Sequence, residues 1–293
     1  MRKAANIVLY VIISLFTVIM IYPFVYAFLG ALSTPEAFAH SGLFPDFRAF
    51  NFANFLEIFY AENFVASLFL TLGRTVYYCI FTVFTSVLLG YVFAKMQFKG
   101  KKIIFMYFMS SMMVPGVATI IPTYILFARF PLVGGNNIIG LGGHGFINEW
   151  PVMFITGLFG IFNVFLVRQS IVEIGDEYKE AAEIDGANLI QIIFKVYLPM
   201  LVPILTYLLI GLVLGQWNDY FFNMMYAYSD EVLKPLGYYV TEIISQYNSY
   251  DTLYQNSPAI LGVAFMFMLP PMIFFMVFQD NFVKNFSIGG IKG

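Results

Sequence analysis

The chain has 293 residues, of which 60% are hydrophobic and only 11% are charged, whereas an ordinary soluble domain carries roughly 25% Asp, Glu, Lys and Arg. So few charges cannot cover the surface of one or two water-soluble domains, and so much apolar surface excludes intrinsic disorder. The formal net charge of -2 leaves no basic excess for nucleic acid. The composition therefore indicates a membrane protein.

Six uncharged hydrophobic runs approach or exceed the roughly 20 helical residues that a bilayer core of about 30 Å requires. They cover residues 4–35, 75–94, 103–128, 151–167, 196–218 and 252–279. The fourth run is the shortest, but Arg168 can extend it because a long basic side chain reaches the interface. We predict an all-α polytopic protein with six transmembrane helices in a single domain over residues 1–293. Prolines should kink the third and sixth helices, at Pro115, Pro122, Pro270 and Pro271.

The distribution of basic residues predicts which side of the membrane holds the termini. An even number of helices places both termini on one side. Eleven of the fifteen Lys and Arg residues then fall on that side and three on the other, with Arg74 unassigned near the second run. Because Lys and Arg accumulate in cytoplasmic loops, both termini are expected in the cytoplasm. The first run is too long for a signal-peptide core, so we expect it to be retained as an anchor.

The most charged part of the chain is the inner segment at residues 173–199, between the fourth and fifth runs. Asp176 is placed to cap a short helix, and Glu177 lies where the helix dipole favours an acid. Gly186 is placed to end this helix in a left-handed conformation. A helix over residues 177–185 spans about 13 Å, which is far too short to cross a membrane.

Two interpretations of this short helix stay open from its residues alone. It is either a solvated acidic surface helix or a helix that docks on another protein. Ala181 and Ala182 leave a nearly bare surface where a partner's backbone can approach. The acids recur at three- and four-residue spacing and are predicted to share one face: Glu173, Asp176, Glu177, Glu180 and Glu183.

The spacing within this segment resembles the EAA motif of ATP-binding-cassette (ABC) importer permeases, E-A-A-x3-G-x9-I-x-L-P. Here Glu180-Ala181-Ala182 is followed by Gly186 and then, nine residues later, by Val196-Tyr-Leu-Pro, with Val196 in the Ile place. Further similarity to the carbohydrate-uptake permeases comes from GIFNVFLVRQS at 160–170, Trp217-Asn218 and the C-terminal SIGGIKG. Within that family the chain is most similar to the second permease subunit, the maltose-permease G-type partner, over nearly its whole length.

Two departures from the family pattern stand out. Gly175 occupies a position where members often have proline, just before the short helix. The glycine-rich outer loop at residues 134–145 is longer than expected, which concerns contacts with a binding protein.

The resemblance implies a type I ABC importer permease fold in the prokaryotic cytoplasmic membrane. It implies a non-enzymatic subunit for binding-protein-dependent import of sugars or oligosaccharides. The implied partners are a sister permease in a heterodimer, two ATP-binding-cassette ATPase subunits and an extracytoplasmic solute-binding protein. ATP and Mg²⁺ are expected on the partner ATPase, because this chain has no G-x4-G-K-[S/T] phosphate loop.

The resemblance also implies that the short helix is a coupling helix, which docks in a cleft of the ATPase. Its glutamate at the start of the motif accepts hydrogen bonds or ion pairs, its alanines allow close packing and its glycine sets the turn. The ATPase-coupling residues are then Glu177, Glu180, Ala181, Ala182, Asp185 and Gly186.

The end of the fifth run is a candidate substrate pathway. An aromatic face, an amide and a carboxylate can stack on and hydrogen-bond a sugar ring, and an ionisable residue at membrane depth marks a functional site by default. These residues are Trp217, Asn218, Asp219 and Tyr220. The alternative is that Trp217 and Tyr220 belong to an interfacial aromatic belt and that Asp219 lies outside the hydrocarbon.

Arg74 has two possible positions. If the second span begins at Phe64, Arg74 is deep and paired; if it begins at Thr75, Arg74 extends outward to the interface, and we expect the second arrangement. No catalytic residue and no metal site is expected, since His40 and His144 have no ligand partners at useful spacing.

Two other functions are compatible with the composition. An ion-coupled secondary transporter of a small polar solute could use Asp219 and Arg74 as a relay, but the doubled architecture of inverted repeats is missing. A polytopic membrane enzyme would need clustered His, Asp or Glu at the membrane face, whereas the inner acids follow one helix. Neither function accounts for the EAA-like segment, so the importer permease is the main prediction.

Overall fold

The computed structural model describes residues 2–42, 44–45, 50–60, 63–155, 159–229, 234–248 and 253–289. These residues form helices and turns, with one isolated antiparallel bridge between Ser33 and Phe50 and no β-strand in the ranges given. The chain divides into two compact units. The first contains Met1–Ser67 and Leu236–Ile273, and the second contains Leu68–Pro235 and Phe274–Gly293.

The first unit is packed around small residues and phenylalanines. A Cβ added at Gly30 would overlap the side chain of Leu261. The helix that contains Gly30, Arg2–Ala31, and the helix that contains Leu261, Leu253–Gly289, therefore approach closely at this glycine. The ring centroids of Phe28 and Phe265 lie 5.0 Å apart, and Phe55 contacts both rings. Its helices are α1 (Arg2–Ala31), α2 (Pro35–Ala39), α3 (Ala53–Tyr60), α14 (Leu236–Asn248) and the first part of α15 (Leu253–Gly289).

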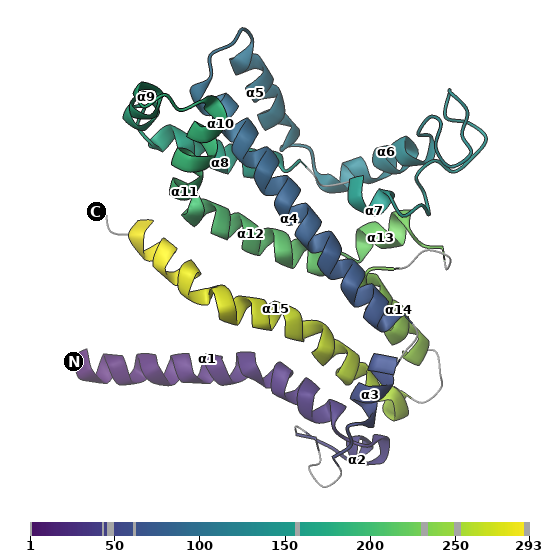
Figure 1. Cartoon of the computed structure of the whole chain (residues 1–293). Coiled ribbons are helices and arrows are strands. Elements are labelled where there is room, and N and C mark those ends of the chain that lie inside the picture. Colours follow the sequence, from purple (N-terminus) through teal and green to yellow (C-terminus); the bar gives the residue numbers. More distant parts are fainter. Residues whose placement is uncertain are drawn as a thin grey trace. The chain divides into compact units, whose positions relative to one another are not determined.

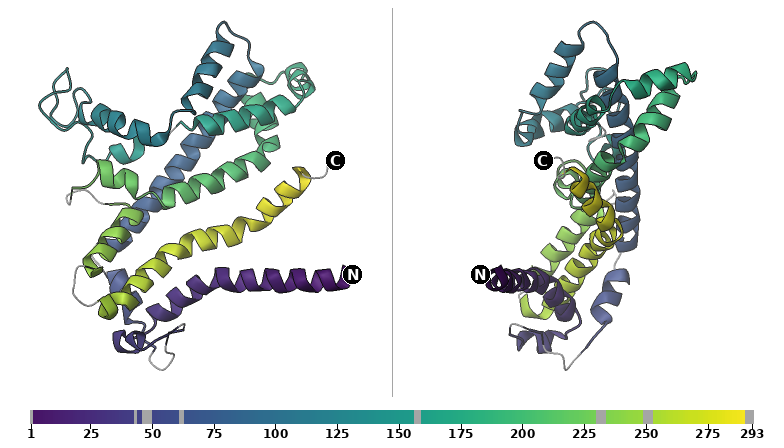
Figure 2. Two further views of the ribbon diagram at one scale, coloured as in Figure 1. Left: turned by 180° about the vertical axis from the view of Figure 1, so that it is seen from behind. Right: turned by 90° about the vertical axis from the view of Figure 1, so that its left-hand side faces the viewer.

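The second unit is built along the long helix α4 (Phe64–Lys95). Helices α8 to α11 gather around the C-terminal half of α4, whereas α7 and α13 lie beside its earlier part (Figures 1 and 2). Each group has its own buried cluster. The other elements are α5 (Lys101–Ser111), α6 (Gly116–Ala128), α7 (Val152–Ile155), α8 (Ile161–Glu173), α9 (Glu177–Ile184), α10 (Leu189–Gln191), the π-helix η1 (Ile192–Tyr197), α11 (Leu198–Met200), α12 (Val202–Trp217) and α13 (Phe221–Tyr226).

Three helices are long and apolar enough to cross a membrane, namely α1, α4 and α15. Two broken pairs also qualify if each is one span: α5 with α6, bent by 101°, and Leu189–Met200 with α12, bent by 79°. The described residues therefore supply up to five spans by length and composition, against six predicted runs. The all-α polytopic class is confirmed.

The breaks in these helices have local causes. The kink expected at Pro115 is a sharp break, because Pro115 has extended backbone angles and becomes the N-cap of α6. The fourth predicted run, residues 151–167, is not one continuous helix. Its parts lie in α7 and α8, with Gly160 as the N-cap of α8 and residues 156–158 outside the described ranges.

The glycine-rich loop that was predicted to lie outside has no regular element between residues 129 and 150, as predicted. A Cβ at Gly134 or Gly140, both at positive φ, would overlap backbone atoms across the loop. The buried amide of Asn136 donates to the carbonyl oxygens of Ala128 (2.9 Å) and Phe130 (3.1 Å). The loop is thus a close-packed turn structure rather than a tether.

Candidate functional site

The segment predicted to dock a partner forms α9, an exposed helix of eight residues closed by a Schellman motif. The Gly186 N–H donates to the Glu183 carbonyl (3.1 Å), and the Ala187 N–H donates to the Ala182 carbonyl (2.9 Å). Gly186 has a φ of 78°, and an added Cβ would meet no atom within 4 Å. Glycine is therefore required here by the backbone conformation rather than by space, and the predicted left-handed helix end is confirmed.

The two alanines of the motif face different ways. Ala181 is exposed, whereas Ala182 is partly buried and packs against the hydrophobic cluster beneath α9. Ala181 alone therefore offers a small surface for close approach. The other predicted coupling residues are also exposed: Glu177, Glu180, Asp185 and Gly186.

Two large apolar side chains on α9 were not selected from the sequence. Ile184 is 86% exposed and Tyr178 is 48% exposed. Each lies three residues from Ala181, so the three share one face of the helix. Apolar residues within an otherwise acidic segment were the available signal. A surface with an isoleucine, a tyrosine and a bare alanine is suited to packing against another protein.

The prediction that five acids share one face is wrong. Glu173 is the last residue of α8 and is separated from α9 by a break in the helix. On α9 itself, Glu183 pairs with Lys179 at 3.5 Å. Glu180 makes no ion pair with any residue that the structure describes. Its carboxylate is therefore available to a partner.

A link between α4 and α9 was missed by the sequence analysis. Asp176 precedes α9 as predicted, but its side chain does not cap the helix. It accepts a hydrogen bond from Lys95 Nζ at 2.6 Å, and the same Nζ donates to the Ile174 carbonyl at 2.7 Å. This hydrogen bond, with the charge of Lys95, lowers the pKa of Asp176 below its usual value. The turn before α9 is thus tied to the end of α4.

Beneath this turn, α9 is seated on a buried cluster drawn from four elements. After α9, a capping box begins α10. The Asn188 N–H donates to Gln191 Oε1 at 2.9 Å, and the Gln191 N–H donates to Asn188 Oδ1 at 3.0 Å. Tyr91 and Tyr197 meet edge to face, 5.3 Å apart. The cluster beneath α9 is built from residues of α4, α8 and α12 as well as η1. The members are Val87, Tyr91, Val167, Ile171, Ile192, Ile193, Tyr197, Leu201, Leu205 and Leu208.

The Lys95 contact predicts a graded effect of substitutions on stability. Lys95→Met removes the donor to the Ile174 carbonyl as well as the partner of Asp176, and the Lys95 side chain is only 8% exposed. We expect it to destabilise the protein by about 1–3 kcal/mol. Asp176→Asn keeps an acceptor and should have a much smaller effect, since the Asp176 side chain is 70% exposed.

Thermal unfolding of the purified complex measures both effects. Because the pKa of Asp176 is lowered in the folded state, the contribution of its charge is fully present at neutral pH and is lost only as the pH falls through that lowered pKa. Stability differences between these variants should therefore not change across the neutral range. Equal stability of Lys95→Met and Asp176→Asn would contradict the assignment of Lys95 as the main tie.

A second polar site lies beside the earlier part of α4, where Arg74 is buried. The expectation that Arg74 reaches outward is wrong, because α4 begins at Phe64 and Arg74 is 2% exposed. Its Nη2 donates to Asp219 Oδ2 at 2.7 Å, and its Nε donates to the Met153 carbonyl at 3.0 Å. Tyr78 donates to the same carbonyl at 3.0 Å. The arginine thereby joins α4, α7 and the end of α12.

The four predicted substrate-pathway residues do not form one surface. Trp217 is buried at 2% exposure, and Asp219 is held by Arg74. Asn218 and Tyr220 are exposed, and the Asn218 amide donates to the Leu214 carbonyl at 2.9 Å. Asn218 and Tyr220 are the two exposed members of the set.

Broken apolar helices together with a short, exposed E-A-A-x3-G helix indicate a membrane transport subunit. The family model for binding-protein-dependent transport system inner membrane components matches residues 86–288. This span contains α9 and the whole cluster beneath it, and it is well over half of the chain. The chain belongs to this family.

Curated relatives and solved structures agree with this assignment. The arabinooligosaccharides transport system permease protein AraQ of Bacillus subtilis is 27% identical over 94% of this chain and 92% of its own length. The lactose transport system permease protein LacG of Rhizobium radiobacter is 23% identical over 99% of this chain and 98% of its own. A crystal structure of a bacterial ABC transporter that imports the acidic polysaccharide alginate contains a chain with a TM-score of 0.75 and 22% identity, covering 95% and 96% of the two chains. The predicted importer permease fold is confirmed.

Proposed function

We propose that this chain is a permease subunit of an ATP-driven, binding-protein-dependent importer of oligosaccharides. The relatives named for arabinooligosaccharides, for melibiose, raffinose and stachyose, and for lactose support a carbohydrate substrate. The family assignment favours this function over an ion-coupled secondary transporter.

Within this proposal, α9 is the coupling helix, and the observation that carries it is the geometry of α9. The helix is exposed, is closed by Gly186 and rests on a buried cluster that includes residues of α4, α8 and α12. A partner ATPase that holds ATP and Mg²⁺ would engage Glu177, Glu180 and Asp185 and the apolar face around Ala181. Closure of the ATPase dimer would then move α9 and its attached helices as one body.

The proposed complex contains this chain, a sister permease, two ATPase subunits and an extracytoplasmic solute-binding protein. A solved alginate transporter was crystallised with a pentasaccharide-bound periplasmic protein, which supports the last partner. The excess of Lys and Arg supports an arrangement with α9 and both termini in the cytoplasm. Asn218 and Tyr220 are the proposed substrate-pathway residues, because both are exposed at the end of α12.

Copurification and transport test this function together. Tagged chain expressed in its native host should bring down an ATPase, a second permease and a solute-binding protein. Vesicles reconstituted with this complex should take up at least one member of a labelled oligosaccharide panel, and only when ATP reaches the ATPase side. Uptake driven by a proton or sodium gradient without ATP would overturn the proposal.

A further inference from the structure

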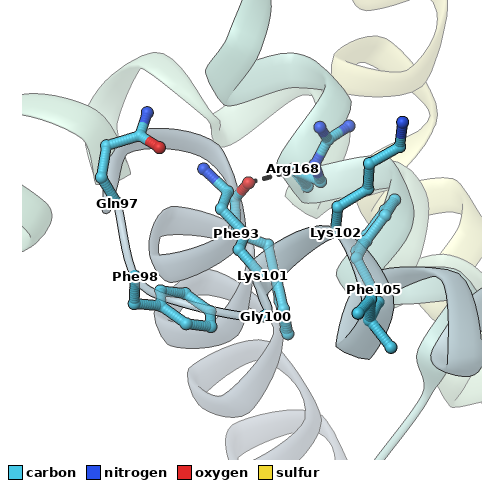
Figure 3. A pocket seen from close by; sticks show the side chains of 9 residues that line it. Phe93, Gln97, Phe98, Gly100, Lys101, Lys102, Phe105 and Arg168 are labelled. Carbon is cyan, nitrogen blue, oxygen red and sulfur yellow. Dashed lines mark hydrogen bonds between the residues drawn. The ribbon is translucent and has the colours of Figure 1, made fainter.

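A basic pocket of about 490 Å³ lies where the last turn of α4, the first turns of α5 and the middle of α8 meet (Figure 3). Its cations are Lys101, Lys102 and Arg168. Figure 3 shows these side chains arranged around the aromatic rings of Phe98 and Phe105. Because α4 is long and apolar enough to cross a membrane and ends at Lys95, we expect the turn that follows it to lie at the membrane surface.

The positive charge of this pocket has no acidic partner among the residues that the structure describes. Within the part of the chain that the structure describes, no carboxylate pairs with Lys101, Lys102 or Arg168. Lys101 Nζ donates to the carbonyl oxygens of Met96 (2.8 Å) and Ala94 (3.2 Å), which fix the ammonium in place.

Arg168 is fixed in a similar way. Its Nε donates to the Phe93 carbonyl at 3.2 Å, and its guanidinium lies 4.4 Å from the centroid of the Phe105 ring. These contacts leave its Nη2 without an acceptor among the described residues. Arg168 and Lys101 thus line the same pocket in fixed positions, and an anion bound between them would relieve their repulsion.

An apolar pocket of about 370 Å³ adjoins the basic one. The two pockets share Phe105, and the second is lined by carbon-rich side chains from α4, α5 and the start of α8, including Leu89, Phe108 and Val164. A free inorganic anion would fill the basic pocket but not this apolar one. A molecule with a phosphate at one end and a hydrocarbon chain at the other matches the chemistry of both pockets, which meet at Phe105.

We propose that these two pockets form a binding site for an anionic phospholipid, with its phosphate at Lys101, Lys102 and Arg168 and part of an acyl chain beside Phe105, Leu89 and Phe108. Basic pockets between helices at the membrane surface are suited to anionic headgroups, whose attraction adds up for each basic residue. The bound lipid would stabilise the packing of α5 against α8. Helix α8 directly precedes the turn that leads into α9.

Native mass spectrometry of the purified complex, titrated with phosphatidylglycerol, phosphatidylcholine or glycerophosphoglycerol, tests this site. The wild-type complex should retain phosphatidylglycerol in preference to phosphatidylcholine, and should bind the chain-free headgroup more weakly. Lys102→Gln should lower phosphatidylglycerol affinity about fivefold. Lys102 is exposed and makes no described side-chain contact, so its replacement should not disturb folding.

Two further variants make the test specific. Lys99→Gln removes the same charge from the same turn, but Lys99 does not line the pocket. This variant should therefore bind phosphatidylglycerol with the affinity of the wild type. Leu89→Phe narrows the apolar pocket and should weaken phosphatidylglycerol binding while leaving glycerophosphoglycerol binding unchanged. Equal effects of Lys102→Gln and Lys99→Gln would overturn the proposal. Equal affinity for the lipid and for its free headgroup would show a simple anion site instead. If the Lys102→Gln complex loses its ATPase subunits but still binds the lipid, Lys102 contacts the ATPase rather than a lipid.

Discussion

Arg74→Met is expected to destabilise the protein by about 3–5 kcal/mol, because it takes the buried Arg74 guanidinium away from the carboxylate of Asp219. The Arg74 side chain is 3% exposed and that of Asp219 is 20% exposed, so the lower half of this range is expected. Arg74→Met also removes the donor to the Met153 carbonyl. Thermal unfolding of the purified complex and its yield from the membrane measure the loss.

The double variant Arg74→Gln with Asp219→Asn separates charge from packing. It removes both charges while keeping groups that can hydrogen-bond, so it should be more stable than Arg74→Met. It should also retain ATP-driven uptake, because in an ATP-driven importer this pair carries no proton. If uptake is lost in the double variant while its stability is restored, the charges of the pair take part in transport itself, which would contradict a purely structural role.

Arg129→Met is the matched control for this prediction. Arg129 is exposed, makes no described ion pair and follows α6, so its replacement should change stability by no more than about 0.5 kcal/mol. Equal stability of Arg74→Met and Arg129→Met would contradict the structural role of the buried pair.

The failure to predict this pair has a physical origin. Arg74 was assigned to the interface because the uncharged run begins after it, yet a helix can begin well before its first charge. The ten residues that precede Arg74 in α4 are all uncharged, and a single buried charge is acceptable when a partner neutralises it. The partner is 145 positions away in sequence, so no local pattern could identify it.

The coupling segment was more predictable because its determinants are local. Neighbouring residues determine the short acidic helix, the glycine at its end and the chain that follows. The structure has α9 and its Schellman motif where this local pattern predicts them. The capping role of Asp176 failed for a tertiary reason. Lys95, at the end of α4, offers the Asp176 carboxylate a charged donor that the helix N-terminus cannot match.

The breaks in the helices were predictable in part. Pro115 marked the break in the third run, since proline cannot donate to the preceding turn. Hydropathy could not show the division between α7 and α8, because residues on both sides of it are apolar and a window average does not detect where one helix ends and the next begins. The orientation of Ala182 toward the core likewise could not be predicted from residue type. Its neighbour Ala181 is also an alanine, yet Ala181 is exposed whereas Ala182 packs against the cluster.

Gly186→Val is expected to lower substrate uptake while leaving ATP hydrolysis active, so that transport is uncoupled. A β-branched residue at a φ of 78° is strained by about 1–2 kcal/mol, which would unwind the last turn of α9. Gly186→Asn is its matched control. Asparagine adopts the left-handed conformation more readily, and no atom lies within 4 Å of an added Cβ. Similar uptake by both variants would show that the backbone conformation of this turn is not needed for coupling.

Glu180→Lys should uncouple transport through the other property of α9, its charge. Loss of a charge-assisted hydrogen bond worth about 1.5–3 kcal/mol corresponds to roughly ten- to hundredfold weaker docking of the ATPase. Glu173→Lys changes the charge equally at the end of α8, outside α9, and should leave uptake near the wild-type rate. Uptake and ATPase rates in reconstituted vesicles measure both. Unchanged uptake in both Glu180→Lys and Gly186→Val would contradict the assignment of α9 as the coupling helix, because neither the charge of Glu180 nor the closed turn at Gly186 would then contribute to docking.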